Sequence, residues 1–360
     1  MRCAISLGGM HAHQAVVVSS VRKELVWLVA LGTLLLASGC SSAQPPAAAV
    51  LRDRISYDAF SAAQSELLLD ERGPSGQELS LRYTATGDPN DPAVILVHGV
   101  PSSSWMYRYV MEHLAEQALY VVAVDNLGYG GSSKPQMETD QAARFYAPNR
   151  QADRLGRLLD ALGIREAGFV VHDVGGPIVW ELLIARPELA SALVVLNTIA
   201  APGGFSPPAA VDNPIVQAGM RIVGFEREAT IRAIVCAMVT VPERIDTPVQ
   251  LEGYYRPFRQ GSELAYYSFL TNLDIVRDRI ATYAALIEQL DLPAAVLWGA
   301  EDEELLAEPS LSWFAAALDI PESRRVLATE AKHLVAEEVP EQIAALAVEV
   351  MLSPAPVATR

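Results

Sequence analysis

Short apolar runs recur along the chain without alternating polar residues, and stretches with helical spacing separate them. A strand with one face in water alternates apolar and polar side chains, whereas a strand covered on both faces does not. The pattern therefore predicts an α/β fold, with a mostly parallel central sheet flanked by helices. The predicted strands span residues 79–86, 93–97, 120–124, 168–171, 192–196, 294–297 and 325–328, and the clearest helices span 150–162, 177–185 and 341–351.

One long interval, residues 201–291, interrupts this rhythm between two predicted strands. Most of it has helical spacing, with Pro and Gly between the helices. The predicted helices there span residues 215–222, 230–239, 262–270 and 277–290. Because ligands in open α/β sheets bind at the carboxyl ends of the strands, we expect residues 201–291 to form a helical cap over that edge. Residues 56–200 and 292–353 would then form the core.

The first part of the chain carries a targeting signal. Arg22 and Lys23 precede an apolar run over residues 25–37, which is short for a membrane-spanning helix of about 20 residues and typical of a secretory signal peptide. The run ends in Ala37-Ser38-Gly39-Cys40. This ending resembles the lipobox of bacterial lipoproteins, although Ala37 stands where leucine is usual.

The lipobox resemblance implies that residues 1–39 are a signal peptide and that Cys40 carries a lipid. The protein would then be extracytoplasmic and anchored to a bacterial membrane through Cys40. Residues 40–55 would form a tether, because much of this stretch is small, uncharged and rich in Pro and Ala. The alternative is an ordinary secretory signal with a chance cysteine.

Composition narrows the range of partners. Hydrophobic residues make up 51% of the chain and charged residues 19%, which is typical of a globular protein. The net charge of −16 has the wrong sign for binding a phosphate backbone and argues against nucleic acid. Cys3, Cys40 and Cys236 are too few and too scattered for a disulfide framework or a zinc site. We therefore expect neither a metal nor another cofactor.

A candidate nucleophile follows the strand over residues 168–171. The chain continues as His172-Asp173-Val174-Gly175-Gly176 and then as a helix, which is the arrangement of a nucleophile elbow with Asp173 at its apex. Small residues are needed there because the turn is tight. The alternative role for Asp173 is to cap the following helix.

Two more residues at strand ends complete a catalytic set. Asp302 follows the strand over residues 294–297, and His333 follows the strand over 325–328. The order nucleophile, acid, histidine is the one that an α/β-hydrolase triad requires. Main-chain N–H groups of Val100 and Val174 would form the oxyanion hole.

Five motifs, HGVPSSSW, DNLGYGGSSKP, HDVGGP, LWGAED and AKHLVAEEVPEQ, resemble those of α/β-hydrolases of the epoxide hydrolase and haloalkane dehalogenase group over roughly residues 75–352. The resemblance implies the α/β-hydrolase fold with a cap, and an alkyl-enzyme ester on Asp173. An ester can be hydrolysed again, whereas a serine alkylated at the same place would be left as an inert ether. His333 would take a proton from water, and Asp302 would orient it.

The leaving group distinguishes epoxide hydrolases from haloalkane dehalogenases. Dehalogenases of this group bind the leaving halide with a tryptophan directly after the nucleophile and with a second donor elsewhere. Here those two positions hold Val174 and Val100. The chain has other tryptophans, Trp105 and Trp180, but neither is at the expected position. An epoxide oxygen leaves as a basic alkoxide and needs an acid such as a phenol. The cap supplies Tyr267, Tyr266 and Tyr254, which we rank in that order, and the alternative is that some of them only pack.

We therefore expect a hydrolase that opens epoxides or related small apolar, alkyl substrates. One alternative is a haloalkane dehalogenase with non-standard halide donors. Another is a lipoprotein that binds an apolar ligand without turnover, because epoxide hydrolases commonly have aromatic residues where Val100 and Val174 stand here.

Overall fold

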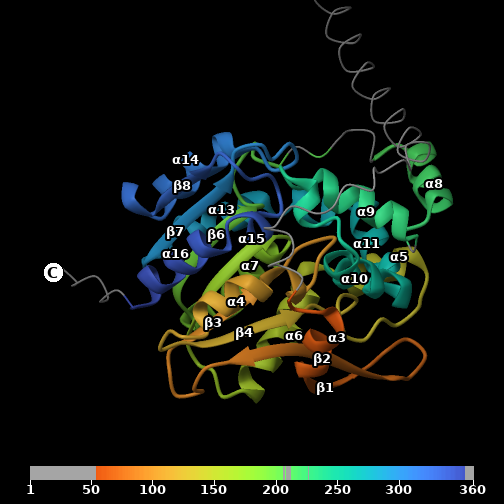
Figure 1. Ribbon diagram of the computed structural model, residues 1–360, viewed down its shortest axis with the longest axis horizontal. Coiled ribbons are helices and arrows are strands. Elements are labelled where there is room, and N and C mark those ends of the chain that lie inside the picture. The colour runs from red at the N-terminus through yellow and green to blue at the C-terminus, as the bar shows by residue number, and fades with distance from the viewer. Residues whose placement is uncertain (1–53, 206, 208–211, 226, 353–360) are drawn as a thin grey trace, which may run out of the picture.

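The computed structural model describes residues 54–352, apart from residues 206, 208–211 and 226 (Figure 1). The predicted signal peptide over residues 1–39 and the predicted lipid site at Cys40 lie outside the described residues, as does nearly all of the predicted tether over residues 40–55. Within the described part of the chain, no helix has both the length and the apolar character that crossing a membrane requires.

Eight strands form one sheet in the order β1-β2-β4-β3-β5-β6-β7-β8, and the strands from β4 to β8 in this order run parallel. The pairs β1–β2 and β2–β4 are antiparallel. The strands are β1 (Ser65–Arg72), β2 (Glu78–Thr86), β3 (Ala93–Val97), β4 (Tyr120–Asp125), β5 (Ala167–Asp173), β6 (Ala190–Thr198), β7 (Ala294–Gly299) and β8 (Arg325–Ala328). The predicted mostly parallel sheet is thus confirmed. Strand β1 was missed because it is a largely exposed edge strand with a mixed sequence, SELLLDER.

Helices cover both faces of this sheet. On one face, α4 (Arg108–Leu114) packs against α16 (Pro340–Leu352), which also contacts β6 and β7. On the other face lie α6 (Pro148–Ala161), α7 (Gly175–Ala185) and α14 (Ala307–Ala317), and Trp180 of α7 packs near Phe314 of α14. Strands β4, β5 and β7 are buried along their whole length. Each large apolar side chain that is buried there contributes about 1.5–3 kcal/mol, so the central strands are rigid supports for the residues at their ends.

The chain between β6 and β7 is mainly helical. It contains α8 (Pro214–Val223), α9 (Glu228–Ala237), α10 (Pro248–Pro257), α11 (Glu263–Leu270), α12 (Asp274–Arg277) and α13 (Ile280–Ile287). Helix α10 begins with Pro248 at its first position, and the Thr247 hydroxyl accepts the Gln250 N–H as a cap. A π-turn, η5 (Phe258–Ser262), joins α10 to α11 and contains Gly261 at φ 114°. The exact limits of a cap domain, residues 201–291, stay a prediction.

Helices α8 to α11 gather beside one side of the sheet together with α5 (Thr139–Phe145), and α13 returns to pack on α7 (Figure 1). The remaining short elements are α3 (Tyr57–Ala63), α15 (Val335–Glu338), η1 (Ser104–Tyr107), η2 (Pro187–Leu189), η4 (Pro242–Arg244) and η6 (Glu322–Arg324).

Candidate active site

Asp173 lies at a strained turn between β5 and α7. Its φ of 49° is in the left-handed region, which is unfavourable for a residue with a side chain and is found at sites where the surrounding structure enforces it. Gly175 allows this turn, because a Cβ there would lie 2.2 Å from the carbonyl oxygen of Val97. Helix α7 has no side-chain cap, so Asp173 is not used to cap it. The carboxylate is instead buried at the carboxyl end of the sheet.

The two predicted oxyanion-hole residues both contact this carboxylate. The N–H of Val100 donates to Asp173 Oδ2 at 2.8 Å, and the N–H of Val174 donates to the same carboxylate. Burial raises the pKa of Asp173, while the charge of His333 and these two N–H groups lower it, and the net direction is upward. Both N–H groups therefore hold the Asp173 carboxylate, and that of Val100 holds its Oδ2 atom.

His333 and Asp302 form a hydrogen-bonded pair. His333 Nδ1 lies 2.9 Å from Asp302 Oδ2. The other carboxylate oxygen, Oδ1, accepts the N–H groups of Glu304 and Leu305 at 2.9 and 3.0 Å. Burial raises the pKa of Asp302, but His333, the Leu305 N–H and the side-chain amide of Asn197 outweigh burial and lower the pKa to about 2. Asp302 is therefore an anion that fixes the imidazole ring.

Three carboxylates surround the imidazole. Burial lowers the pKa of His333, but the charges of Asp302, Asp173 and Glu304 outweigh burial and raise the pKa to about 10. His333 is therefore an imidazolium at neutral pH while Asp173 carries its charge. Loss of the Asp173 charge would lower the pKa of His333 again.

Two of the polar residues around this pair were missed in the sequence. Asn197, at φ 26° near the end of β6, donates from Nδ2 to Asp302 Oδ2 at 2.6 Å and accepts the Gly299 N–H at 3.0 Å. Its position after an apolar strand, like that of Asp302, was a signal that could have found it. Glu304 gave no such signal, since it stands in a run of acidic residues.

The three predicted phenols have different surroundings. The Tyr254 hydroxyl donates to Glu337 Oε1 at 2.5 Å, and the Tyr267 hydroxyl donates to the carbonyl oxygen of Gln217 at 3.3 Å. Tyr266 packs edge-on against two phenylalanine rings, and its hydroxyl has no hydrogen-bond partner among the described residues. Burial raises the pKa of Tyr266, and the charges of Glu304 and Asp173 raise it further. Of the three hydroxyls, that of Tyr266 is thus the one without a hydrogen bond to another described residue, and that of Tyr254 is engaged by Glu337.

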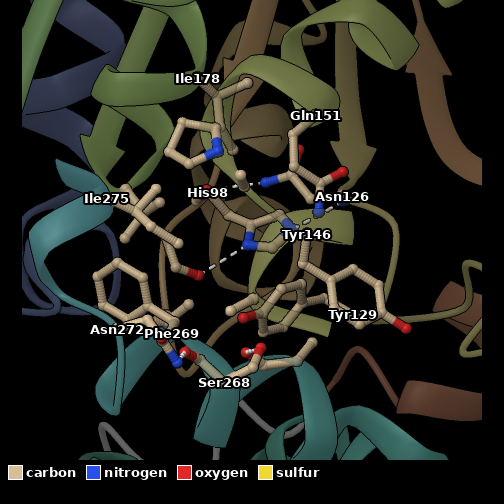
Figure 2. A pocket seen from close by; sticks show the side chains of 17 residues that line it. His98, Asn126, Tyr129, Tyr146, Gln151, Ile178, Ser268, Phe269, Asn272 and Ile275 are labelled. Atoms are coloured by element: carbon tan, nitrogen blue, oxygen red, sulfur yellow. Dashed lines mark hydrogen bonds between the residues drawn. The ribbon is translucent and has the colours of Figure 1, made fainter. Parts of the chain in front are cut away.

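Val100 and Val174 line a small cavity of about 30 Å³. Figure 2 shows this cavity, with Tyr129, Phe269 and Ile275 among its labelled lining residues. The cavity has room for roughly one or two water molecules. Tyr129, a buried phenol that the sequence analysis did not single out, lines it, and burial raises the pKa of Tyr129, as do the nearby charges of Tyr146, Tyr266 and Asp173. The wall combines the core with α5, α11 and α12, and its apolar members include Val100, Val174, Ile178, Ala265, Phe269 and Ile275.

Several indole N–H groups that could bind a halide are engaged elsewhere. Those of Trp105, Trp180 and Trp298 donate to the carbonyl oxygens of Gln250, Ile199 and Leu305 at 3.3, 3.1 and 2.7 Å. None of the three lines the cavity. In the described part of the chain there is also no cluster of His, Cys, Asp and Glu that could hold a metal ion.

Comparison with known proteins agrees with the geometry of the fold. Residues 92–234 match the family model described as alpha/beta hydrolase fold. Epoxide hydrolase A of Mycobacterium tuberculosis is 34% identical over 146 residues, which are 41% of this chain and 42% of that protein. Bifunctional epoxide hydrolase 2 of Rattus norvegicus is 37% identical over 107 residues, which are 30% of this chain and 18% of that protein. The matches thus span less than half of these relatives.

Solved structures match over more of the chain. Haloalkane dehalogenase DpaA from Paraglaciecola agarilytica has a TM-score of 0.64 at 20% identity, covering 81% of this chain and 94% of that one. Epoxide Hydrolase A from Mycobacterium thermoresistibile has a TM-score of 0.61 at 23% identity, covering 80% and 98%. The chain therefore has the α/β-hydrolase fold, and proteins named as epoxide hydrolases are among its relatives.

Proposed function

We propose that this chain, which has the α/β-hydrolase fold, is a hydrolase that opens epoxides through an alkyl-enzyme ester on Asp173. The observation that carries the proposal is the surroundings of Asp173. Asp173 is a buried carboxylate at a strained turn, and two main-chain N–H groups donate to it. Its charge also helps to keep the nearby His333 imidazole, which is paired with Asp302, in the charged form. The epoxide hydrolase relatives support the choice of substrate.

In the first step, the free oxygen of the Asp173 carboxylate attacks an epoxide carbon. The carbon–oxygen bond of the ring breaks, and the departing oxygen takes a proton. We assign this proton to the Tyr266 hydroxyl, because the hydroxyl has no competing partner among the described residues and interacts with the Asp173 charge. A phenol whose pKa lies above its usual value of about 10 keeps its proton until an alkoxide develops.

Ester formation then prepares the second step. It removes the Asp173 charge, which is one of the charges that raise the pKa of His333, so His333 becomes able to give up its proton. This proton passes through water to the Tyr266 phenolate left by the first step and restores the phenol. Neutral His333 takes a proton from water, and the hydroxide attacks the ester carbonyl carbon. Val100 and Val174 hold the resulting oxyanion, while Asp302 stabilises the imidazolium. The ester bond breaks, a diol leaves, and the Asp173 carboxylate is restored.

A trapping experiment tests the proposal. The His333→Gln variant is incubated with a panel of terminal and internal alkyl epoxides, digested and analysed by mass spectrometry. We expect the mass of one epoxide on the peptide that contains Asp173, and no adduct when Asp173→Asn is added. Unmodified Asp173 with every epoxide would contradict the proposal.

The engaged indole N–H groups make a haloalkane dehalogenase the weaker candidate, because halide departure needs such donors near Asp173. Halide release from bromoalkanes at rates equal to epoxide opening would reverse this ranking. A lipoprotein that binds without turnover is the remaining alternative. It would be favoured if Asp173→Ala kept every measurable property of the parent.

We also propose that Cys40 anchors the protein to the outer side of a bacterial membrane, on the sequence Ala37-Ser38-Gly39-Cys40 alone. Labelling growing cells with a clickable palmitate analogue tests this proposal. We expect label in the membrane fraction for the parent chain and none for Cys40→Ser. Label that is unchanged in Cys40→Ser would contradict it.

A further inference from the structure

Hydrogen bonds on both sides of His333 link its loop to the helical segment between β6 and β7, one of them directly and the other through Glu338. The N–H of Leu334, one residue after His333, donates to the carbonyl oxygen of Met238 at 3.1 Å. The N–H of Lys332, one residue before it, donates to Glu338 Oε2 at 2.7 Å. Met238 directly follows α9, so the backbone around His333 depends on the position of that helix.

Glu338 completes the second of these links. Its other oxygen, Oε1, accepts the N–H of Thr240 at 2.6 Å and also lies in contact with the Thr240 hydroxyl. The Glu338 side chain is buried in α15. One carboxylate therefore joins Lys332, beside the imidazole, to Thr240, just beyond α9.

The core fixes the same loop at three carbonyl groups: that of Ala331 accepts the Glu301 N–H at 3.2 Å, that of Lys332 accepts Asn197 Nδ2 at 3.4 Å, and the third is the carbonyl oxygen of His333. His172 Nε2 donates to this oxygen at 2.8 Å, so the position of the carbonyl follows β5. The N–H groups on either side follow the α9 segment instead. A shift of α9 relative to the sheet would thus displace the peptides on either side of His333 and strain the hydrogen bond by which Asp302 holds its ring.

The backbone beside His333 is thus linked to the α9 segment directly at Met238 and, through the Glu338 carboxylate, at Thr240. We propose that Glu338 is a positioning residue that couples the position of the α9 segment to the alignment of His333. This inference rests on the proposed function, because it concerns the step in which His333 activates water.

The coupling predicts an effect on one half-reaction only. Asp173 forms the ester without help from His333 as a base, whereas hydrolysis of the ester requires the imidazole in place. Loosening the Glu338 link should therefore slow ester hydrolysis and leave ester formation nearly unchanged. A residue that only stabilises the fold would affect both steps together.

Glu338→Gln is the decisive variant. Glutamine has a single side-chain oxygen, so its NH₂ group would face either the Lys332 N–H or the Thr240 N–H, and one of the two links would be lost. Rapid-mixing measurements with a terminal alkyl epoxide would give both rates for the full chain. We expect hydrolysis to slow by roughly 10- to 100-fold, as a displacement of about 1 Å does in catalysis, with ester formation within about 3-fold of the parent.

Glu330→Gln is the matched control. Glu330 lies three residues before His333, and its exposed carboxylate accepts a hydrogen bond from Gln342 and takes no part in the Glu338 link. The same substitution there should leave both rates unchanged. Equal slowing of both steps in Glu338→Gln, or unchanged hydrolysis in a folded variant, would overturn the inference.

A second pair of variants covers the case in which Glu338→Gln does not fold. Thr240→Val removes the hydroxyl that contacts Glu338 and the carbonyl oxygen of Glu330 but keeps the backbone N–H on Glu338, so we expect a smaller, selective slowing of hydrolysis. Thr240→Ser keeps the hydroxyl and should restore the parent rate. Identical hydrolysis rates in Thr240→Val and the parent would again overturn the inference. Failure of the proposed function has a different signature, since no ester would then form in any variant, including His333→Gln.

Discussion

Tyr254→Phe tests whether stability and chemistry are assigned to the right tyrosines. Tyr254 donates to Glu337 Oε1 at 2.5 Å inside a buried cluster, and Arg108 donates to both oxygens of the same carboxylate at 2.5 and 2.8 Å. Burial raises the pKa of Tyr254, and so does the charge of Glu337, so the hydroxyl keeps its proton and acts as a donor. The substitution removes this one donor and changes little of the packing.

The expected loss of stability follows from that contact. A hydrogen bond to a charged group contributes about 1.5–3 kcal/mol. Arg108 still neutralises Glu337 in the variant, so no charge is left unpaired and the larger cost of a broken buried ion pair does not apply. We therefore expect the free energy of unfolding to fall by about 2 kcal/mol.

Two assays on each variant separate the roles. Denaturant titration gives the free energy of unfolding, and rapid mixing with an epoxide gives the rate of ester formation. For Tyr254→Phe we expect the loss of about 2 kcal/mol with ester formation within about 2-fold of the parent. For Tyr266→Phe we expect the reverse, a stability change within about 0.5 kcal/mol and ester formation slower by roughly 10²–10⁴-fold. Loss of ester formation in Tyr254→Phe, with ester formation kept in Tyr266→Phe, would refute the assignment of Tyr266 as the proton donor.

Three further substitutions test the remaining parts of the site. Because the pKa of His333 is raised to about 10, its charge stabilises the folded state fully below pH 6.5, and this stabilisation is lost as the pH rises toward about 10. Asp302→Asn should therefore make the free energy of unfolding fall less steeply over this pH range, as measured by denaturant titration. An unchanged pH profile would contradict the charge assigned to His333. Asn197→Ala removes a donor from Asp302 at 2.6 Å, so steady-state assays should show slower turnover by about 10-fold, and an unchanged rate would count against a role for Asn197 in holding Asp302. Phe269→Ala enlarges the cavity and should raise kcat/KM for branched epoxides relative to linear ones, whereas an equal change for both would mean that Phe269 does not limit substrate size.

The central part of the fold was predictable because its strands are buried on both faces. Runs such as residues 93–97 and 294–297 are continuously apolar, and the structure places them inside the sheet. The edge strand β1 was not predicted, because five of its eight side chains are exposed and its sequence has neither an apolar run nor alternating apolar and polar residues. Burial explains why the central strands could be predicted, but not β8, which was predicted at residues 325–328 although only one of its four side chains is buried.

The same distinction applies to the site. The positions of Asp173, Asp302 and His333 follow from strand ends, which bring residues far apart in the chain to one edge of the sheet. Their catalytic roles stay predictions. The direction in which each cap phenol points depends on how the helices pack, and spacing in the sequence does not contain that information. Tyr266 and Tyr267 are neighbours on one helix, yet only Tyr267 reaches the backbone of α8.

A single turnover in ¹⁸O-labelled water tests the ester most directly. With enzyme in excess over a terminal alkyl epoxide, water attacks the carbonyl carbon of the ester, so one labelled oxygen should remain in the Asp173 carboxylate. The diol of that first turnover should carry an unlabelled oxygen from Asp173. Label in the diol with none on Asp173 would show that water attacks the epoxide directly, and would contradict the account.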